Sequence, residues 1–83
     1  MDTDSRVKRV LSKALIIDDS LIIDSALLVE ELGVSSLDRF ELLMGLEEEF
    51  EIEIDEHDME GVKTVADVVH CIERKTERKE LIL

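Results

Sequence analysis

The sequence predicts an all-α fold, a small four-helix bundle with three main helices, a short third helix and a long loop between helices one and two. Apolar residues recur at helical spacing in several segments, no segment reads convincingly as a strand, and the 83 residues include no proline. A chain of this length forms one domain and buries only about 60% of its unfolded surface. We therefore expect a single small core.

The first helix is expected from about Asp4 to Leu15, after a run of good N-cap residues. Its apolar positions follow the spacing of one helix face: Val7, Val10, Leu11, Ala14 and Leu15. The next stretch, residues 15–27, is rich in β-branched side chains, but an isolated short hairpin is only marginally stable in water. We expect a long ordered loop instead, with three inward anchors: Ile17, Ile22 and Leu28.

A second helix is expected from Ser36 to about Phe50, after a short turn that Gly33 ends. Ser35 lies three residues before Asp38, which is capping-box spacing and makes Ser35 the N-cap. One face of this helix should meet the core: Leu42, Leu43, Leu46 and Phe50. The opposite face mixes apolar side chains with carboxylates, as suits transient docking: Leu37, Glu41, Met44 and Glu48.

The C-terminal third should contain a brief turn near Glu56 to Glu60, at the place of the short third helix, and a last helix that Thr64 caps. The apolar stripe of the last helix is Val65, Val68, Val69 and Ile72. Beyond Arg74 the chain becomes charged and then apolar, which predicts a helical extension or disorder. We expect the folded domain to span residues 1–76 and a tail to span residues 77–83.

The composition restricts the possible partners. Ten Lys and Arg residues against 22 Asp and Glu residues give a net charge of −12, which argues against binding to nucleic acid or anionic membranes. A protein with a basic patch is the expected partner. The single Cys71 excludes an internal disulfide and favours the reducing cytoplasm, and no apolar run reaches signal-peptide or membrane-spanning length, so stable membrane insertion is not expected.

Ser36 is the residue best suited to carry a modification. As the first helical residue it would lie beside unpaired backbone N–H groups and the positive end of the helix dipole, which favour an attached phosphate ester. On these grounds alone, a serine at a helix start is more often unmodified than modified. No neighbouring base suggests a catalytic nucleophile, and the spacing of His57, His70 and Cys71 does not form a metal-ligand set. We therefore expect no enzymatic activity and no metal.

The segment around Ser36 resembles the recognition helix of acyl carrier proteins. The resemblance is carried by Gly33, Ser36-Leu37-Asp38, Glu41-Leu42, Met44 and Leu46 to Phe50, and it extends from about Arg6 to Ile72. In that family a transferase esterifies the serine with 4'-phosphopantetheine from coenzyme A, and the terminal thiol of this arm holds an acyl group as a thioester. The resemblance implies that Ser36 bears the arm. One departure is Ser35, where the family usually has aspartate.

The resemblance also implies a role for the acidic helix. Its exposed residues would dock the phosphopantetheinyl transferase and the acyl-transferring and chain-modifying enzymes that present basic patches. The expected docking residues are Leu37, Asp38, Glu41, Met44, Glu47 and Glu48. The function implied is that of a discrete, monomeric, cytoplasmic carrier in fatty acid or related lipid or secondary-metabolite biosynthesis.

A cargo pocket is a further expectation, although an ordinary closed core fits the same residues equally well. Its candidate lining is Leu28, Leu32, Arg39, Leu42, Leu46, Ile54, Met59, Val62, Val68 and Ile72. Arg39 stands where the family more often has a small residue. Its stem could simply pack along apolar surface with the guanidinium in solvent. Alternatively, Arg39 narrows the pocket mouth or pairs with a polar or carboxylated cargo.

Two other functions fit the same sequence. One is a specialised carrier of aminoacyl or polyketide intermediates. The other is an unmodified acidic interaction module, in which Ser36→Ala would leave binding intact. Loading assays and the mass of the chain distinguish these possibilities.

Overall fold

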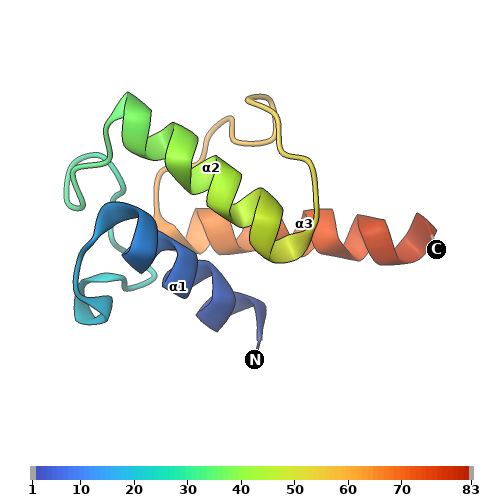
Figure 1. Cartoon of the computed structure of the whole chain (residues 1–83), viewed down its shortest axis with the longest axis horizontal. Helices are drawn as coiled ribbons and strands as arrows, with labels where there is room; N and C mark the ends of the chain where they lie inside the picture. Colours follow the sequence, from blue (N-terminus) through green and yellow to red (C-terminus); the bar gives the residue numbers. More distant parts are fainter. Residues whose placement is uncertain (1, 83) are drawn as a thin grey trace.

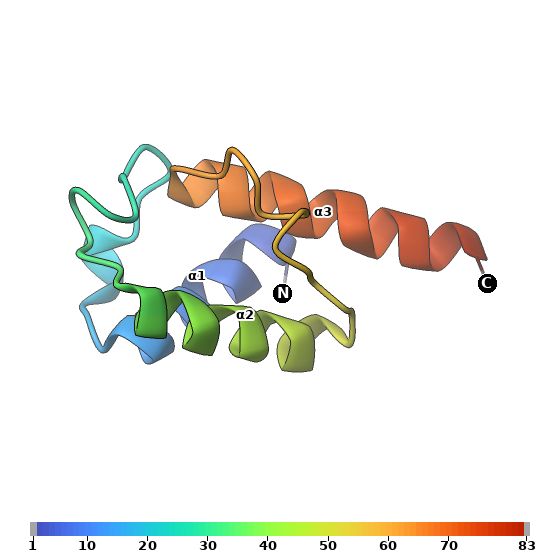
Figure 2. The same ribbon diagram turned by 90° about the horizontal axis from the view of Figure 1, so that it is seen from above.

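The computed structural model describes the backbone of residues 2–82 and the side chains of residues 2–77. Its helices are α1 (Thr3–Leu15), the short 3-10 helix η1 (Asp19–Leu21), α2 (Ser36–Phe50) and α3 (Val65–Ile82) (Figure 1). α1 packs against both α2 and α3. α2 and α3 run in the same general direction and α1 runs opposite to them, so the connection at 51–64 returns along the domain (Figure 2). The all-α prediction is confirmed.

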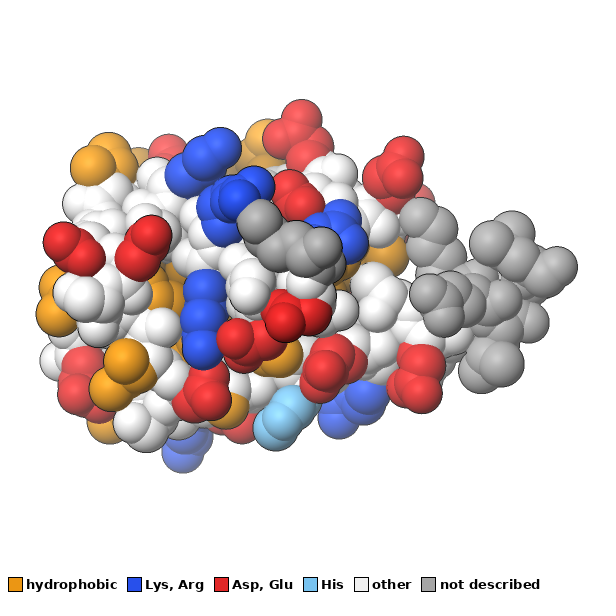
Figure 3. Space-filling model, turned by 90° about the horizontal axis from the view of Figure 1, so that it is seen from below, with side chains coloured by type: hydrophobic (Ala, Val, Ile, Leu, Met, Phe, Trp, Pro, Cys, Tyr) orange, Lys and Arg blue, Asp and Glu red, His pale blue; other side chains and the backbone are white. Residues whose placement is uncertain are grey.

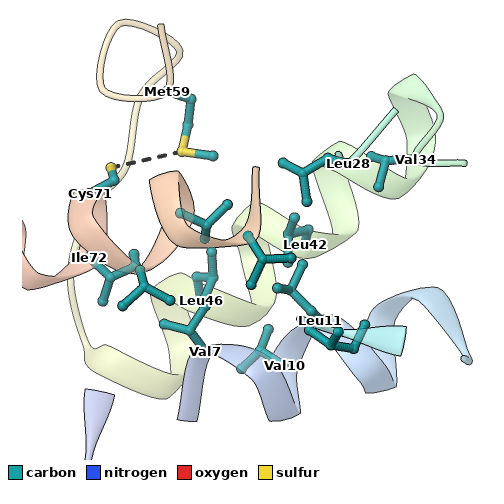
Figure 4. Close-up of a cluster of buried hydrophobic side chains, with 14 of the residues drawn as sticks. Val7, Val10, Leu11, Leu28, Val34, Leu42, Leu46, Met59, Cys71 and Ile72 are labelled. Carbon is teal, nitrogen blue, oxygen red and sulfur yellow. Dashed lines mark hydrogen bonds between the residues drawn. The ribbon is translucent and has the colours of Figure 1, made fainter. Parts of the chain in front are cut away.

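The core is mostly aliphatic and is shared by all three α-helices and both long connections (Figure 4). Its buried members are Val7, Val10, Leu11, Ile22, Ala26, Leu28, Val34, Leu42, Leu46, Phe50, Ile54, Met59, Val65, Val68, Val69, Cys71 and Ile72. On α2 the expected core face is confirmed, with Leu43 half-buried at its margin. A Cβ atom on Gly45 would lie 2.9 Å from Val10 Cγ1, so the missing side chain allows α1 and α2 to approach closely.

The connection at 16–35 is ordered, as expected. Ile22 and Leu28 are buried and Ile17 packs on the core. Backbone hydrogen bonds join this connection to the start of α3: Leu28 N–H donates to the Lys63 carbonyl over 2.9 Å, and Val65 N–H donates to the Ala26 carbonyl over 3.1 Å. An isolated antiparallel bridge between Leu27 and Thr64 belongs to the same junction, and residues 2–82 form no strand.

The brief turn expected near Glu56 to Glu60 is confirmed, because residues 56–61 form turns, but the short third helix of the predicted bundle does not form there. Asp55 and Asp58 each accept a hydrogen bond from the other's backbone N–H, at 2.9 and 3.0 Å. Side-chain bonds of this kind favour a turn over a continuing helix. Gly61, at φ 81°, ends the segment. The bundle therefore has three α-helices among the described residues, plus η1.

α3 begins as predicted, because Thr64 and Asp67 form a reciprocal capping box with two hydrogen bonds of 3.1 Å. Its backbone stays helical to Ile82, through the expected end of the domain. The boundary between residues 76 and 77 stays a prediction. The backbone of residues 77–82 is helical, which agrees with the predicted helical extension. The structure does not describe the side chains of residues 78–82.

Arg6 ties the start of α1 to the end of α2. Its Nε donates to Glu49 Oε2, and a second guanidinium N–H donates to the Glu49 carbonyl, each over 2.8 Å. The guanidinium carbon lies 4.3 Å from the centroid of the Phe50 ring. A cation at this carbonyl stabilises the C-terminal end of α2 through the helix dipole.

Candidate functional site

Ser36 is the first residue of α2 and its side chain is exposed. Ser35 is the N-cap: Asp38 N–H donates to Ser35 Oγ over 3.1 Å, and Ser35 N–H donates to Asp38 Oδ2 over 3.0 Å. The predicted capping box is therefore confirmed. At this position helix geometry leaves the N–H groups of Ser36 and Leu37 without intrahelical acceptors. They and the helix dipole favour an anion at Ser36.

This cap gives a stability prediction. Ser35→Ala should lower the free energy of unfolding by about 1 kcal/mol, because the N–H of Asp38 loses its acceptor, whereas Ser35→Asp should change it by only a few tenths. Urea unfolding followed by circular dichroism measures both variants. An alanine variant as stable as the parent chain would mean that the capping box contributes nothing.

The exposed face of α2 carries three large apolar side chains. Leu37 is 67% exposed, Phe40 62% and Met44 52%. Leu37 and Met44 were expected there. Phe40 was missed, although it lies three residues after Leu37 and four before Met44, which is the spacing of one helix face. Apolar anchors exposed on an acidic helix suit a transient interface.

The carboxylates of α2 fall into two groups. Glu41 and Glu48 are exposed and border a groove beside α1. Asp38 and Glu47 also bond within the domain, since Asp38 belongs to the capping box and Glu47 Oε2 accepts the backbone N–H of Ile54 over 2.9 Å. Glu47 thus anchors the connection after α2. The face of the molecule shown in Figure 3 carries basic and acidic side chains next to one another.

An apolar cavity of about 340 Å³ lies between α2 and the connections on either side of it. It brings together five of the expected pocket residues: Leu28, Arg39, Leu42, Met59 and Val62. The remaining expected residues pack in or against the core without lining this cavity: Leu32, Leu46, Ile54, Val68 and Ile72. The structure adds residues that the helical pattern did not reveal: Leu27, Val29, Glu30, Val34 and Lys63.

Arg39 lines this cavity with an exposed side chain. Within residues 2–77 its guanidinium forms no salt bridge. The side chain therefore borders the cavity while its charge remains in solvent.

A second, polar cavity of about 500 Å³ borders α3 and includes Cys71. The Cys71 thiol donates to the Asp58 carbonyl over 3.4 Å, and burial raises the pKa of this thiol. Lys75 bonds the Asp58 carboxylate over 2.8 Å and lowers its pKa. Burial and a raised pKa make the thiol unreactive. The side chains described contain no group of three His, Cys, Asp or Glu placed to hold a metal ion.

None of the described helices is both long and apolar enough to cross a lipid bilayer.

Comparison with known proteins connects this site with a family. The family model described as "Phosphopantetheine attachment site" matches residues 5–72. The chain is 41% identical over 71 residues to an acyl carrier protein of Thermotoga maritima, covering 86% of this chain and 88% of that protein. An acyl carrier protein of Clostridium perfringens is also 41% identical, over 73 residues, covering 88% of this chain and 96% of the relative.

The fold agrees with these matches. A solved Mycobacterium tuberculosis structure, described as a candidate acyl carrier protein, aligns with a TM-score of 0.80 at 32% identity, covering 88% of this chain and 97% of that one. The matched region spans the capped helix start, the acidic helix and the core. The chain belongs to the acyl carrier protein family, whose members carry their cargo on a phosphopantetheine arm.

Proposed function

We propose that Ser36 is the attachment residue and that this chain carries acyl groups as thioesters on its 4'-phosphopantetheine arm. The observation that supports this most is an exposed hydroxyl on the first residue of a capped helix, inside the region that matches the attachment-site family. In the transfer, Ser36 Oγ gives its proton to a base of the transferase and forms a bond to the β-phosphorus of coenzyme A. The P–O bond of the pyrophosphate bridge breaks, and adenosine 3',5'-bisphosphate leaves. The capped helix start supplies N–H groups and a dipole that favour the resulting phosphodiester.

We propose that the exposed face of α2 docks the transferase and the acyl-transferring enzymes. Leu37, Phe40 and Met44 supply apolar contacts, while Glu41 and Glu48 supply charge for basic patches. Asp38 and Glu47 contribute charge at the margin, with their carboxylates already partly satisfied. Exposed ion pairs of this kind add only about 0.2–1 kcal/mol each, which suits a carrier that must dissociate after each transfer.

Charge reversal on this face should slow docking. The double variant Glu41→Lys/Glu48→Lys should lower the association rate with a transferase that presents a basic patch by about tenfold or more at low salt, because electrostatic steering is lost. Stopped-flow fluorescence at several salt concentrations measures this rate. Added salt should reduce the difference between the parent chain and the variant.

The matched control is Glu53→Lys/Glu73→Lys, which makes the same change in net charge at exposed positions away from this face. Its association rate should fall much less. An equal fall in both double variants would show that net charge, and not the face of α2, governs docking.

The 340 Å³ cavity is the proposed site for the acyl chain, because its walls are largely aliphatic and it borders the first half of α2. We place the chain in the cytoplasm as a monomer, in fatty acid biosynthesis or a related lipid or secondary-metabolite pathway. Its relatives named acyl carrier proteins and its single, buried cysteine support this assignment. Arg39 at the cavity also favours a second candidate, a carrier specialised for a polar cargo.

The carrier function is tested on the chain purified from the cells that make it. Intact mass spectrometry should show one phosphopantetheine on part or all of the protein, with acyl adducts that hydroxylamine removes while the arm remains. A wholly unmodified population, still bound to a basic partner protein, would instead support the acidic interaction module.

A further inference from the structure

Two cations border the apolar cavity beside α2. Arg39 extends from α2, and Lys63 lies in the segment before α3, thirteen residues beyond the end of α2. Both side chains are exposed, and neither forms a salt bridge within residues 2–77. One carboxylate, Glu30, lines the same cavity. The cavity therefore has more positive than negative side chains, in a protein with a net charge of −12.

Other basic residues of this chain have local partners or lie elsewhere. Arg6, Lys8 and Lys75 each form salt bridges of 2.8 Å to carboxylates. Lys13 has no salt bridge among the described residues, but it borders a groove with three glutamates: Glu41, Glu48 and Glu49. At the cavity beside α2, by contrast, two unpaired cations meet aliphatic walls. Such a site is complementary to a ligand that is apolar along its length and anionic at one group.

We propose that this cavity selects an acyl chain that bears a carboxylate. The methylenes would pack against Leu28, Leu42 and Met59, and the carboxylate would meet Arg39 and Lys63 at the solvent-accessible edge. Glu30 opposes the same anion and limits its binding. This inference rests on the proposed carrier function and adds the class of cargo.

The two cations and the one carboxylate at this cavity should affect binding of the carboxylated chain in opposite directions. Arg39→Gln or Lys63→Gln should reduce the ratio of cavity-bound to unbound carboxylated chain by about 1.4- to 5-fold each, which is the range for one exposed ion pair. Glu30→Gln should raise it by a similar factor. A neutral chain should respond to none of these changes, because it offers no charge.

Methionine NMR can report where the chain lies. Met59 lines the cavity and is 3% exposed, whereas Met44 is 52% exposed on the docking face and does not line the cavity. With ¹³C-labelled methionine methyl groups, the protein would be compared with an unacylated arm, an octanoyl arm and a suberoyl arm. Octanoyl and suberoyl have the same chain length, and only suberoyl ends in a carboxylate.

In the parent chain both acyl groups should shift the Met59 methyl resonance relative to the unacylated arm, and the Met44 resonance should stay in place. In Arg39→Gln and Lys63→Gln the suberoyl-dependent shift should shrink while the octanoyl-dependent shift remains. The matched control is Lys13→Gln, which makes the same charge change at the α1 groove. It should leave both shifts unchanged.

Three results would overturn the inference. The suberoyl shift could be the same in all the variants, or be absent in the parent chain while the octanoyl shift is present. Alternatively, the unacylated arm could show the dependence on Arg39 and Lys63, and the cations would then bind the phosphodiester of the arm. Intact mass is recorded before each spectrum. If the mass shows that no arm has been attached, the carrier function itself is rejected, together with this inference. If the mass shows a loaded arm but the spectra show no charge selection, only this inference is rejected.

Discussion

Replacing Leu46 by alanine should lower the free energy of unfolding by about 2–5 kcal/mol, because it removes a large buried side chain and leaves a cavity. Leu46 is 0% exposed and lies in the cluster shared by α1, α2 and α3 (Figure 4). Small domains have only about 5–15 kcal/mol of stability in total. The variant should therefore be unfolded to a measurable extent at physiological temperature.

Equilibrium urea unfolding, followed by circular dichroism, measures this loss. The matched control is Leu37→Ala, which makes the same substitution on the same helix at a side chain that is 67% exposed. Its stability should change by no more than about 0.5 kcal/mol. Equal losses in the two variants would contradict the placement of Leu46 in the core and Leu37 at the surface.

The main helices could be predicted because their signals are local. Ser35 and Asp38 determine the start of α2, Thr64 and Asp67 determine the start of α3, and the apolar spacing identifies the buried faces. The end of α1 at Leu15 agrees with the prediction, although the residue that follows is not a usual helix stop. Ile16 ends the helix at φ 53° and is 89% exposed, a conformation usually taken by glycine and uncommon for a β-branched residue.

Other features depend on contacts between segments far apart in the chain. The cavity beside α2 forms because residues 26–28 bond to residues 63–65, which brings Lys63 to the same cavity as Arg39. A helical pattern contains no information on such a junction. The turn near Glu56 to Glu60 has a local cause, because the paired side chains of Asp55 and Asp58 stabilise it and leave no short third helix. Phe40 was overlooked even though its spacing places it on the docking face.

Ser36→Ala should abolish attachment of the phosphopantetheine arm, because it removes the hydroxyl on the first residue of the capped α2 to which the arm is attached. Ser35→Ala is the matched control, since it removes the neighbouring hydroxyl and weakens only the cap. The effect of Ser36→Ala on modification should be complete, whereas Ser35→Ala should still accept the arm, at most more slowly.

The most direct measurement is intact mass spectrometry after incubation of each purified protein with coenzyme A and a broad-specificity phosphopantetheinyl transferase. The account predicts that the parent chain and Ser35→Ala each gain one phosphopantetheine and that Ser36→Ala gains none. A gain on Ser36→Ala, or no gain on the parent chain with several transferases, would contradict the assignment of Ser36 as the attachment residue.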